Sequence, residues 1–188
     1  MKKIASGTEL LNPEEILRTA GIEQGMKVGA FGSGNGGFFA LQAAELVGKD
    51  GRVYAFDVRK DALESVENKA RFGGILNLDF VWTDLEEYGA AKRIPDASLD
   101  LGLLVNTLHE TEDRRAAMRE CIRMIKPGGT LLVVDWERSA SLFGPPPERR
   151  VHPDILKEMA GELDLDLDRE FKAGQYHYGL LFKKHSHT

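Results

Sequence analysis

The sequence predicts an α/β protein built on a doubly wound, mostly parallel β-sheet. Two observations support this prediction: short runs that are apolar at consecutive positions, and helical segments that separate these runs. Parallel strands covered by helices on both faces are apolar throughout, and each needs a crossover before the next. The expected strands are listed by residue range as 26–31, 52–58, 78–84, 99–105 and 129–136.

The expected helices lie at 12–20, 37–48, 59–73 and 111–129. The first has Asn12 in the position of a helix cap and Pro13 in its first turn, both of which favour helix initiation. In the last, apolar residues recur at positions 118, 121, 122 and 125, which is typical of a helix packed on a core. Cys121 lies on this face, so we expect a packed thiol and not a nucleophile.

The last quarter of the chain predicts a loop, a helix and a strand pair. The segment "SLFGPPPERR" indicates a loop through its glycine and three prolines, and a helix is expected near 152–162. The segment "DREFKAGQYHYGLLFKK" predicts two short strands about a glycine turn, which we interpret as an antiparallel pair at the sheet edge.

Composition narrows the function classes. The chain has 188 residues, 42% hydrophobic and 29% charged, which fits one domain with a sizeable core. The net charge of -5 argues against a surface that binds duplex nucleic acid. No apolar run reaches the roughly 20 residues of a membrane span, and we expect no membrane partner. With one cysteine and no apolar leader at the N-terminus, the expected setting is cytoplasmic.

The stretch "GAFGSGNGGFF" at 29–39 predicts a nucleotide-binding turn after the first strand. Gly32, Gly34 and Gly37 match GxGxxG, and Gly36 completes GxGxG, but glycines also mark ordinary turns. Asp57, at the end of the second strand, adds a carboxylate that can accept hydrogen bonds from ribose hydroxyls. These features predict a nucleoside site and leave a nicotinamide dinucleotide and S-adenosylmethionine both open.

Further segments establish a resemblance. Asp84 closes the third strand, and "KPGGTLLVVDW" leads out of a helix into a strand. With the glycines and Asp57 in this order, the chain resembles the class I S-adenosylmethionine-dependent methyltransferases, and most closely the small type 11 members with similar "LHE", "VDW" and "GPPPE" segments. The resemblance implies a seven-stranded sheet with an antiparallel C-terminal strand.

The resemblance also implies one methyltransferase domain over 1–188. Within it, 1–24 would form an N-terminal helix and cofactor lid, 25–138 the nucleoside-binding core, and 139–184 a substrate-side loop, helix and strand pair. The implied cofactor is S-adenosylmethionine, with S-adenosylhomocysteine as product. The residues implied to bind it are Gly32, Gly34 and Gly36 at the methionine end, Asp57 at the ribose, Val58, Asp84 and Leu85 at the adenine, and Asn106 beneath the sulfonium.

The chain departs from the family pattern at Ala30, where members usually carry an acid near the methionine amino group. Losing such a partner costs on the order of 1–3 kcal/mol in a partly buried site. Glu9 and Asn12 are possible substitutes.

Candidate acceptor-side residues lie just after the fourth strand and at the end of the fifth. His109 is the candidate general base, because imidazole titrates near neutrality, although it could instead cap a helix or shape the pocket. Glu110, Asp135, Trp136, Arg150 and Tyr176 are the candidate substrate-pocket residues, and Arg149 beside Arg150 could meet an anionic substrate. The spacing of His109, Asp135 and His177 is not diagnostic of a metal site, so no metal is expected.

We therefore expect methyl transfer to a small-molecule acceptor of unknown identity. "VNTLHE" lacks the Asn-Pro-Pro-aromatic pattern of nucleic-acid amino methylases. Two alternatives remain: an NAD(P)-dependent reductase, which would use the GxGxxG reading of the turn, and a non-catalytic S-adenosylmethionine-binding module, which Ala30 favours.

Overall fold

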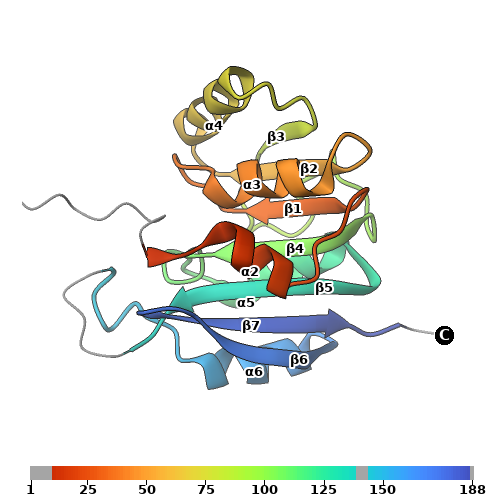
Figure 1. Ribbon diagram of the computed structural model, residues 1–188. Helices are drawn as coiled ribbons and strands as arrows, with labels where there is room; N and C mark the ends of the chain where they lie inside the picture. Colours follow the sequence, from red (N-terminus) through yellow and green to blue (C-terminus); the bar gives the residue numbers. More distant parts are fainter. Residues whose placement is uncertain (1–9, 139–143, 187–188) are drawn as a thin grey trace, which may run out of the picture.

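The computed structural model describes residues 10–138 and 144–186. Its centre is one seven-stranded sheet in the order β3-β2-β1-β4-β5-β7-β6 (Figure 1). This confirms the predicted α/β class and the strand count. The strands are β1 (Lys27–Phe31), β2 (Arg52–Asp57), β3 (Leu78–Trp82), β4 (Leu99–Val105), β5 (Ile125–Trp136), β6 (Leu165–Gly174) and β7 (His177–Lys184).

Strand order reverses between β1 and β4. The first five strands are parallel, and β1 pairs with β2 on one side and β4 on the other. The chain therefore leaves β1 in one direction and returns past it to form β4, which opens a crevice at their carboxyl ends. At the other end of the sheet, β7 is antiparallel to both β5 and β6, as the sequence predicts for the terminal pair.

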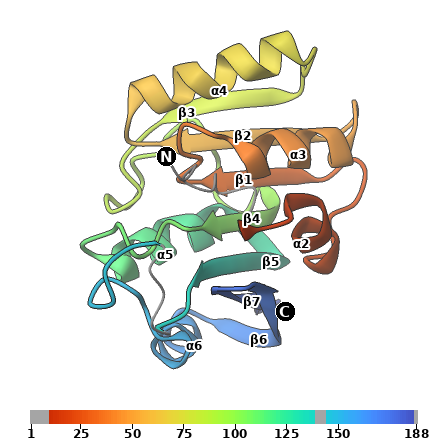
Figure 2. The same ribbon diagram turned by 60° about the vertical axis from the view of Figure 1, so that its left-hand side comes forward.

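Helices cover the sheet on both faces, each over its own apolar core (Figures 1 and 2). One layer contains α2 (Pro13–Thr19), α3 (Phe38–Val47) and α4 (Lys60–Phe72), whose buried residues pack with Val28, Val53 and Leu101 of the strands. The other contains α5 (Arg114–Met124) and α6 (Pro153–Glu162), which pack with Phe31, Phe56 and Phe182. Two covered faces explain why the strands are apolar at consecutive positions.

The expected helix over 111–129 is wrong at both ends. Helix α5 begins after Asp113, whose side chain accepts a hydrogen bond from the Ala116 N–H at 2.9 Å, and it ends at Met124. Ile125 already belongs to β5 and pairs with Leu99. Pro127 cannot donate a helical hydrogen bond, and Gly128 has a φ of +75°. The apolar periodicity therefore counted one strand residue, Ile125, as part of a helix face.

Two predicted helix starts are confirmed by their caps. Asn12 accepts a hydrogen bond from the Glu15 N–H at 3.3 Å, and Pro13 opens α2. His152 accepts one from the Asp154 N–H at 3.2 Å at the start of α6. In the described part of the chain, no helix has the length and apolar character needed to cross a bilayer.

A buried ion pair holds the loop that follows β3. The Glu120 side chain in α5 is fully buried and lies 2.8 Å from Arg123. Its carboxylate also accepts hydrogen bonds from the Gly89 N–H at 2.7 Å and the Ala91 N–H at 3.2 Å. Burial opposes the charge, but the hydrogen bonds from Arg123, Gly89 and Ala91 outweigh it and lower the pKa of Glu120. Neighbouring Cys121 is buried, as predicted, and its pKa is well above its ordinary value, chiefly through burial.

We expect Glu120→Ala to destabilise the fold by about 3–5 kcal/mol, because two backbone N–H groups and the Nε and Nη2 groups of Arg123 lose their acceptor. Arg123 keeps its ion pair with Asp96. Because its folded pKa is depressed, the ionic contribution of Glu120 is present above its ordinary pKa of 4.5 and is lost as the pH falls below it. Urea unfolding at neutral pH measures the effect. Exposed Glu64→Ala is the matched control, and equal stability of the two variants would contradict the role given to the pair.

Candidate functional site

A cavity of about 460 Å³ lies at the carboxyl ends of β1, β2 and β4. It includes Ala30 and extends from Leu11 and Pro13 at the start of α2 to Glu110 and Thr111 after β4. All eight residues that the resemblance assigns to the cofactor line it. They are Gly32, Gly34, Gly36, Asp57, Val58, Asp84, Leu85 and Asn106.

The glycine turn brings backbone up to the cavity wall. Gly32 and Gly34 have φ angles of +73° and +60°, a region that favours glycine. A Cβ on Gly32 would lie 2.6 Å from the Thr107 side chain, so this position is closed to larger residues on two grounds. The N–H groups of Gly32 and Ser33 donate to the Phe56 carbonyl at 3.0 and 2.9 Å, which fixes the turn against β2.

Asp57 fastens the same turn from the other side. Its carboxylate, 8% exposed, accepts hydrogen bonds from the Gly34 N–H at 2.8 Å and the Arg59 N–H at 2.9 Å. A carboxylate has about four acceptor positions, so two hydrogen bonds leave capacity for ligand hydroxyls. Asp57 therefore combines a structural role with the chemistry needed at a ribose.

Two buried oxygens at this wall have no hydrogen-bond partner among the described residues: Ser33 Oγ and Asn106 Oδ1. Both residues line the cavity, and Asn106 has a φ of +54°, which is uncommon for a residue other than glycine. Buried polar groups are usually satisfied, so these atoms are available to a polar ligand or to water in the cavity. Of the suggested substitutes for the missing acid, Asn12 caps α2 and does not line this cavity, while Glu9 lies outside the described residues.

The charge of the cavity lining favours a cation. Among the described lining residues the acids are Asp57, Asp84, Glu86 and Glu110, against a single basic residue, Arg59. The sulfonium and ammonium of S-adenosylmethionine match this excess of negative charge. The pyrophosphate of a dinucleotide would be repelled by it.

A second cavity, of about 440 Å³, adjoins the first and shares Asn106 and Glu110 with it. Trp136 and the loop residues Pro145 and Pro146 give it an apolar side. Its other lining residues are His109, Gly144 and Arg149.

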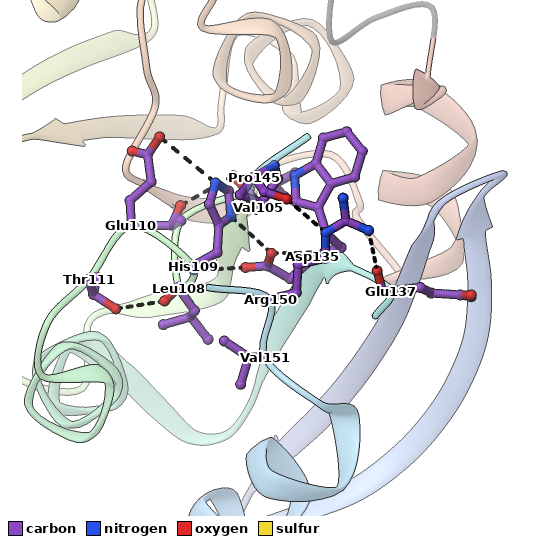
Figure 3. Close-up of polar contacts among 12 residues, drawn as sticks. Val105, Leu108, His109, Glu110, Thr111, Asp135, Glu137, Pro145, Arg150 and Val151 are labelled. Atoms are coloured by element: carbon purple, nitrogen blue, oxygen red, sulfur yellow. Dashed lines mark hydrogen bonds and ion pairs between the residues drawn. The ribbon is translucent and has the colours of Figure 1, made fainter. Parts of the chain in front are cut away.

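His109 and Asp135 form a buried pair beside the second cavity (Figure 3). His109 Nδ1 lies 2.9 Å from Asp135 Oδ1, and the His109 N–H donates to Asp135 Oδ2 at 3.3 Å. Asp135 Oδ1 also accepts from the Trp136 N–H at 2.8 Å. On the other side of the ring, His109 Nε2 lies 3.8 Å from Glu110 Oε1. The ring thus bridges a buried carboxylate and an exposed one.

The remaining candidates, Arg149, Arg150 and Tyr176, make polar contacts of their own. Arg150 is buried and donates to the Pro145 carbonyl at 2.9 Å and the Glu137 carbonyl at 3.1 Å, while Arg149 pairs with Glu112 at 3.0 Å. The Tyr176 carbonyl accepts from the Glu137 N–H at 2.8 Å. Neither Arg150, Tyr176 nor Asp135 lines either cavity. In residues 10–138 and 144–186 no group of three or more His, Cys, Asp or Glu is arranged to hold a metal ion.

His177 supports the Trp136 wall. Its fully buried ring lies 4.1 Å from the Trp136 ring, centroid to centroid, and neither ring nitrogen has a hydrogen-bond partner within the described chain. Burial lowers the pKa of His177 to about 4, and the nearby His109 and Arg150 act in the same direction against the charge of Asp135.

Sequence reasoning did not select several lining residues. Ser33 stands between two selected glycines, but only the structure shows that its hydroxyl is buried at the cavity. Phe38 and Thr107 belong to the first cavity, and Gly144, Pro145 and Pro146 to the second. The prolines signalled a loop, but which wall a loop completes depends on long-range packing.

The fold is a doubly wound α/β domain with a cavity at the point where the strand order reverses. Residues 30–133 match the family model of the methyltransferase domain, type 11, and the chain belongs to that family.

Relatives and solved structures agree with this assignment. The chain is 32% identical over 123 residues to the ubiquinone/menaquinone biosynthesis C-methyltransferase UbiE of Shewanella woodyi, covering 65% of this chain and 47% of that protein. It thus spans about half the length of the curated relatives it matches. A SAM-dependent methyltransferase from Aquifex aeolicus has a similar structure, with a TM-score of 0.86, 26% identity, and coverage of 96% of this chain and 93% of that one.

A third similarity shows the fold alone. The [4+2]-cyclase SpnF has a TM-score of 0.78 with 16% identity, covering 93% of this chain and 80% of that one. Its name describes a cyclase, so reaction type has to be argued from the site and not from the fold.

We expect the stability of the protein to fall by about 2 kcal/mol between pH 7 and pH 5 because of His177 alone. The pKa of His177 is about 4 in the folded chain against an ordinary value of 6.5, so the unfolded chain takes up a proton first as the pH falls. The loss begins near pH 6.5 and levels off below pH 4. Urea unfolding of His177→Phe should lack this component, and a variant with the full wild-type pH dependence would contradict the assignment.

Proposed function

We propose that this protein transfers a methyl group from S-adenosylmethionine to a small-molecule acceptor. The observation that carries the proposal is the first cavity, whose acidic lining and unpaired buried oxygens fit a cationic nucleoside. The adjoining second cavity provides a separate space for the acceptor. A small acceptor, no nucleic-acid partner and a cytoplasmic setting are parts of the same proposal.

The residues that would hold S-adenosylmethionine are those that the family resemblance assigns, and their presence in the lining of the first cavity supports the assignment. Asp57 accepts hydrogen bonds from the ribose hydroxyls, while Val58 and Leu85 contact the adenine and Asp84 accepts at its edge. The glycine turn and the unpaired Asn106 Oδ1 meet the methionine end. At the methionine end, Asn106 Oδ1 would supply an acceptor in place of the acid that is missing at Ala30.

When bound, S-adenosylmethionine supplies an electrophilic methyl group on a positively charged sulfur. The protein then has to hold the acceptor in line, and positioning alone contributes several kcal/mol to such reactions. Asn106 and Glu110 lie in the wall common to both cavities, so they are placed to orient groups on either side. His109 Nε2 would take a proton from an acceptor that arrives protonated.

The two alternatives are weaker. A reductase that uses NAD(P) would place a pyrophosphate against four acids and one arginine, which is unfavourable. A binding module without turnover is favoured by Ala30, but the second cavity with its His109–Asp135 pair exceeds what binding a nucleoside requires.

S-adenosylhomocysteine should stabilise the protein by about 2.7 kcal/mol at a hundredfold excess over its dissociation constant, and NADH should not. Urea unfolding with and without each ligand measures the stabilisation.

Asp57→Ala should weaken binding of S-adenosylhomocysteine by about 1.5–3 kcal/mol, roughly ten- to hundredfold, because a charged acceptor of two hydroxyls is lost. Calorimetric titration measures the binding.

Exposed Asp61→Ala, on the helix that follows Asp57 and outside the cavity, is the matched control and should bind normally. Stabilisation by NADH alone would refute the methyltransferase proposal. Unchanged binding by folded Asp57→Ala would show instead that the ribose lies elsewhere.

His109→Gln should lower kcat by roughly 10²–10⁴-fold with little change in affinity for S-adenosylhomocysteine, since glutamine cannot accept the proton. The acceptor for the assay is obtained by transferring a labelled methyl group to a metabolite pool. His152→Gln, at the exposed cap of α6, is the control. A His109→Gln enzyme that keeps most of its activity would limit His109 to shaping the pocket.

A further inference from the structure

We propose that Asp135 is a positioning residue. It holds His109 in the tautomer that leaves Nε2 unprotonated and facing the second cavity. Such a nitrogen can take up a proton, so the acceptor it suits is one that binds in its protonated form. This inference rests on the proposed function for the identity of the reaction. The state of the imidazole can be measured without any reaction.

The tautomer follows from the groups around Asp135. Its side chain is fully buried and meets three nitrogens: His109 Nδ1, the His109 backbone N–H and the Trp136 backbone N–H, at 2.9, 3.3 and 2.8 Å. A carboxylate only accepts hydrogen bonds, and an unpaired buried charge is costly. The ring nitrogen that completes this set must therefore donate, which puts the proton of a neutral imidazole on Nδ1 and leaves the lone pair on Nε2.

Nε2 then points away from the buried carboxylate. It lies 3.8 Å from Glu110 Oε1, and Glu110 belongs to the wall shared by the two cavities. Asp135 fixes this orientation through the backbone as well as through the ring, because its carboxylate also accepts a hydrogen bond from the His109 backbone N–H. The pair thus directs its basic nitrogen to where the acceptor meets the cofactor cavity.

The neighbouring charges leave the carboxylate paired with His109. The charged and titratable groups around the pair are Glu110, His177, Arg150 and Tyr178. The Tyr178 hydroxyl donates to the Val151 carbonyl at 2.8 Å, and burial together with the charge of Asp135 raises its pKa, so it stays neutral. His177 is neutral at physiological pH and makes no hydrogen bond to Asp135 within the described chain. Arg150 donates to the Pro145 and Glu137 carbonyls, and the Glu110 side chain is largely exposed. When Nε2 takes up a proton, Asp135 is the buried charge that balances it.

This arrangement selects a class of acceptor. A hydroxyl, thiol or ammonium group would release its proton to Nε2 and keep the electron pair of that bond for the methyl carbon. The electron pair of the sulfur–methyl bond would go to the sulfur, so that S-adenosylhomocysteine leaves. The proton later leaves through the exposed side at Glu110 to water. Trp136, Pro145 and Pro146 accommodate an apolar ring or chain beside that group. An acceptor that is already a free nucleophile would have no use for the pair.

The test is nitrogen-15 NMR of histidine-labelled protein at alkaline pH, where imidazoles are neutral, with His109→Gln to assign the signals. We expect a protonated Nδ1 and an unprotonated Nε2 on His109. Asp135→Asn offers one oxygen and an NH₂ group to the three donors, so it should shift His109 toward the other tautomer. Glu110→Gln, which removes the nearer exposed charge, should leave the tautomer unchanged.

A wild-type His109 protonated on Nε2, or an unchanged tautomer in Asp135→Asn, would overturn the proposal. If Asp135→Asn does not fold, the wild-type protein decides: its Nδ1 proton should exchange slowly with water, and rapid exchange counts against the buried hydrogen bond. Asp135→Asn should also lower kcat by roughly 10²–10⁴-fold while S-adenosylhomocysteine binds normally. Failure of that ligand to bind wild type would sink the proposed function and leave the tautomer result standing.

Discussion

The pairing of β1 with β4 is the constraint on which the rest of the structure depends. It places the reversal of strand order in the middle of the sheet, so the turns after Phe31 and Val105 open side by side. The glycines from one turn and Asn106 from the other then line one cavity together. The hydrogen bond from Thr107 Oγ1 to the Phe31 carbonyl at 3.0 Å joins the two turns directly.

Asp57 and Asp135 play comparable parts at the ends of two other strands. Each is a buried carboxylate that accepts hydrogen bonds from neighbouring backbone N–H groups: those of Gly34 and Arg59 for the first, and those of His109 and Trp136 for the second. Acidic side chains at strand ends thus organise loops before they meet any ligand. The protein uses local backbone donors to stabilise the charges that the chemistry requires, which is the usual condition for burying a carboxylate.

Much of the fold could be predicted because its signals are local. Apolar runs predicted the five parallel strands, and the caps at Asn12 and the glycine turn were visible in the sequence. The end of α5 could not be predicted, because Ile125 suits a helix face and a strand equally. Only its pairing with Leu99 assigns it to β5. Likewise the sequence indicated that His109 follows one strand and that Asp135 and Trp136 end another. The contact between His109 and Asp135 depends on the β4–β5 register.

The residues that form the two cavities are made at different stages of synthesis. The residues that line the first cavity end at Thr111, whereas the Trp136 wall of the second is supported by His177, the first residue of the last strand. Until β7 is made, β5 presents an unpaired edge, which is a known route to aggregation. Changes in the final third of the chain can therefore alter the second cavity without changing residues that line the first. The same segment supplies β7, which covers the edge of β5 and so protects the newly made sheet from pairing with other chains.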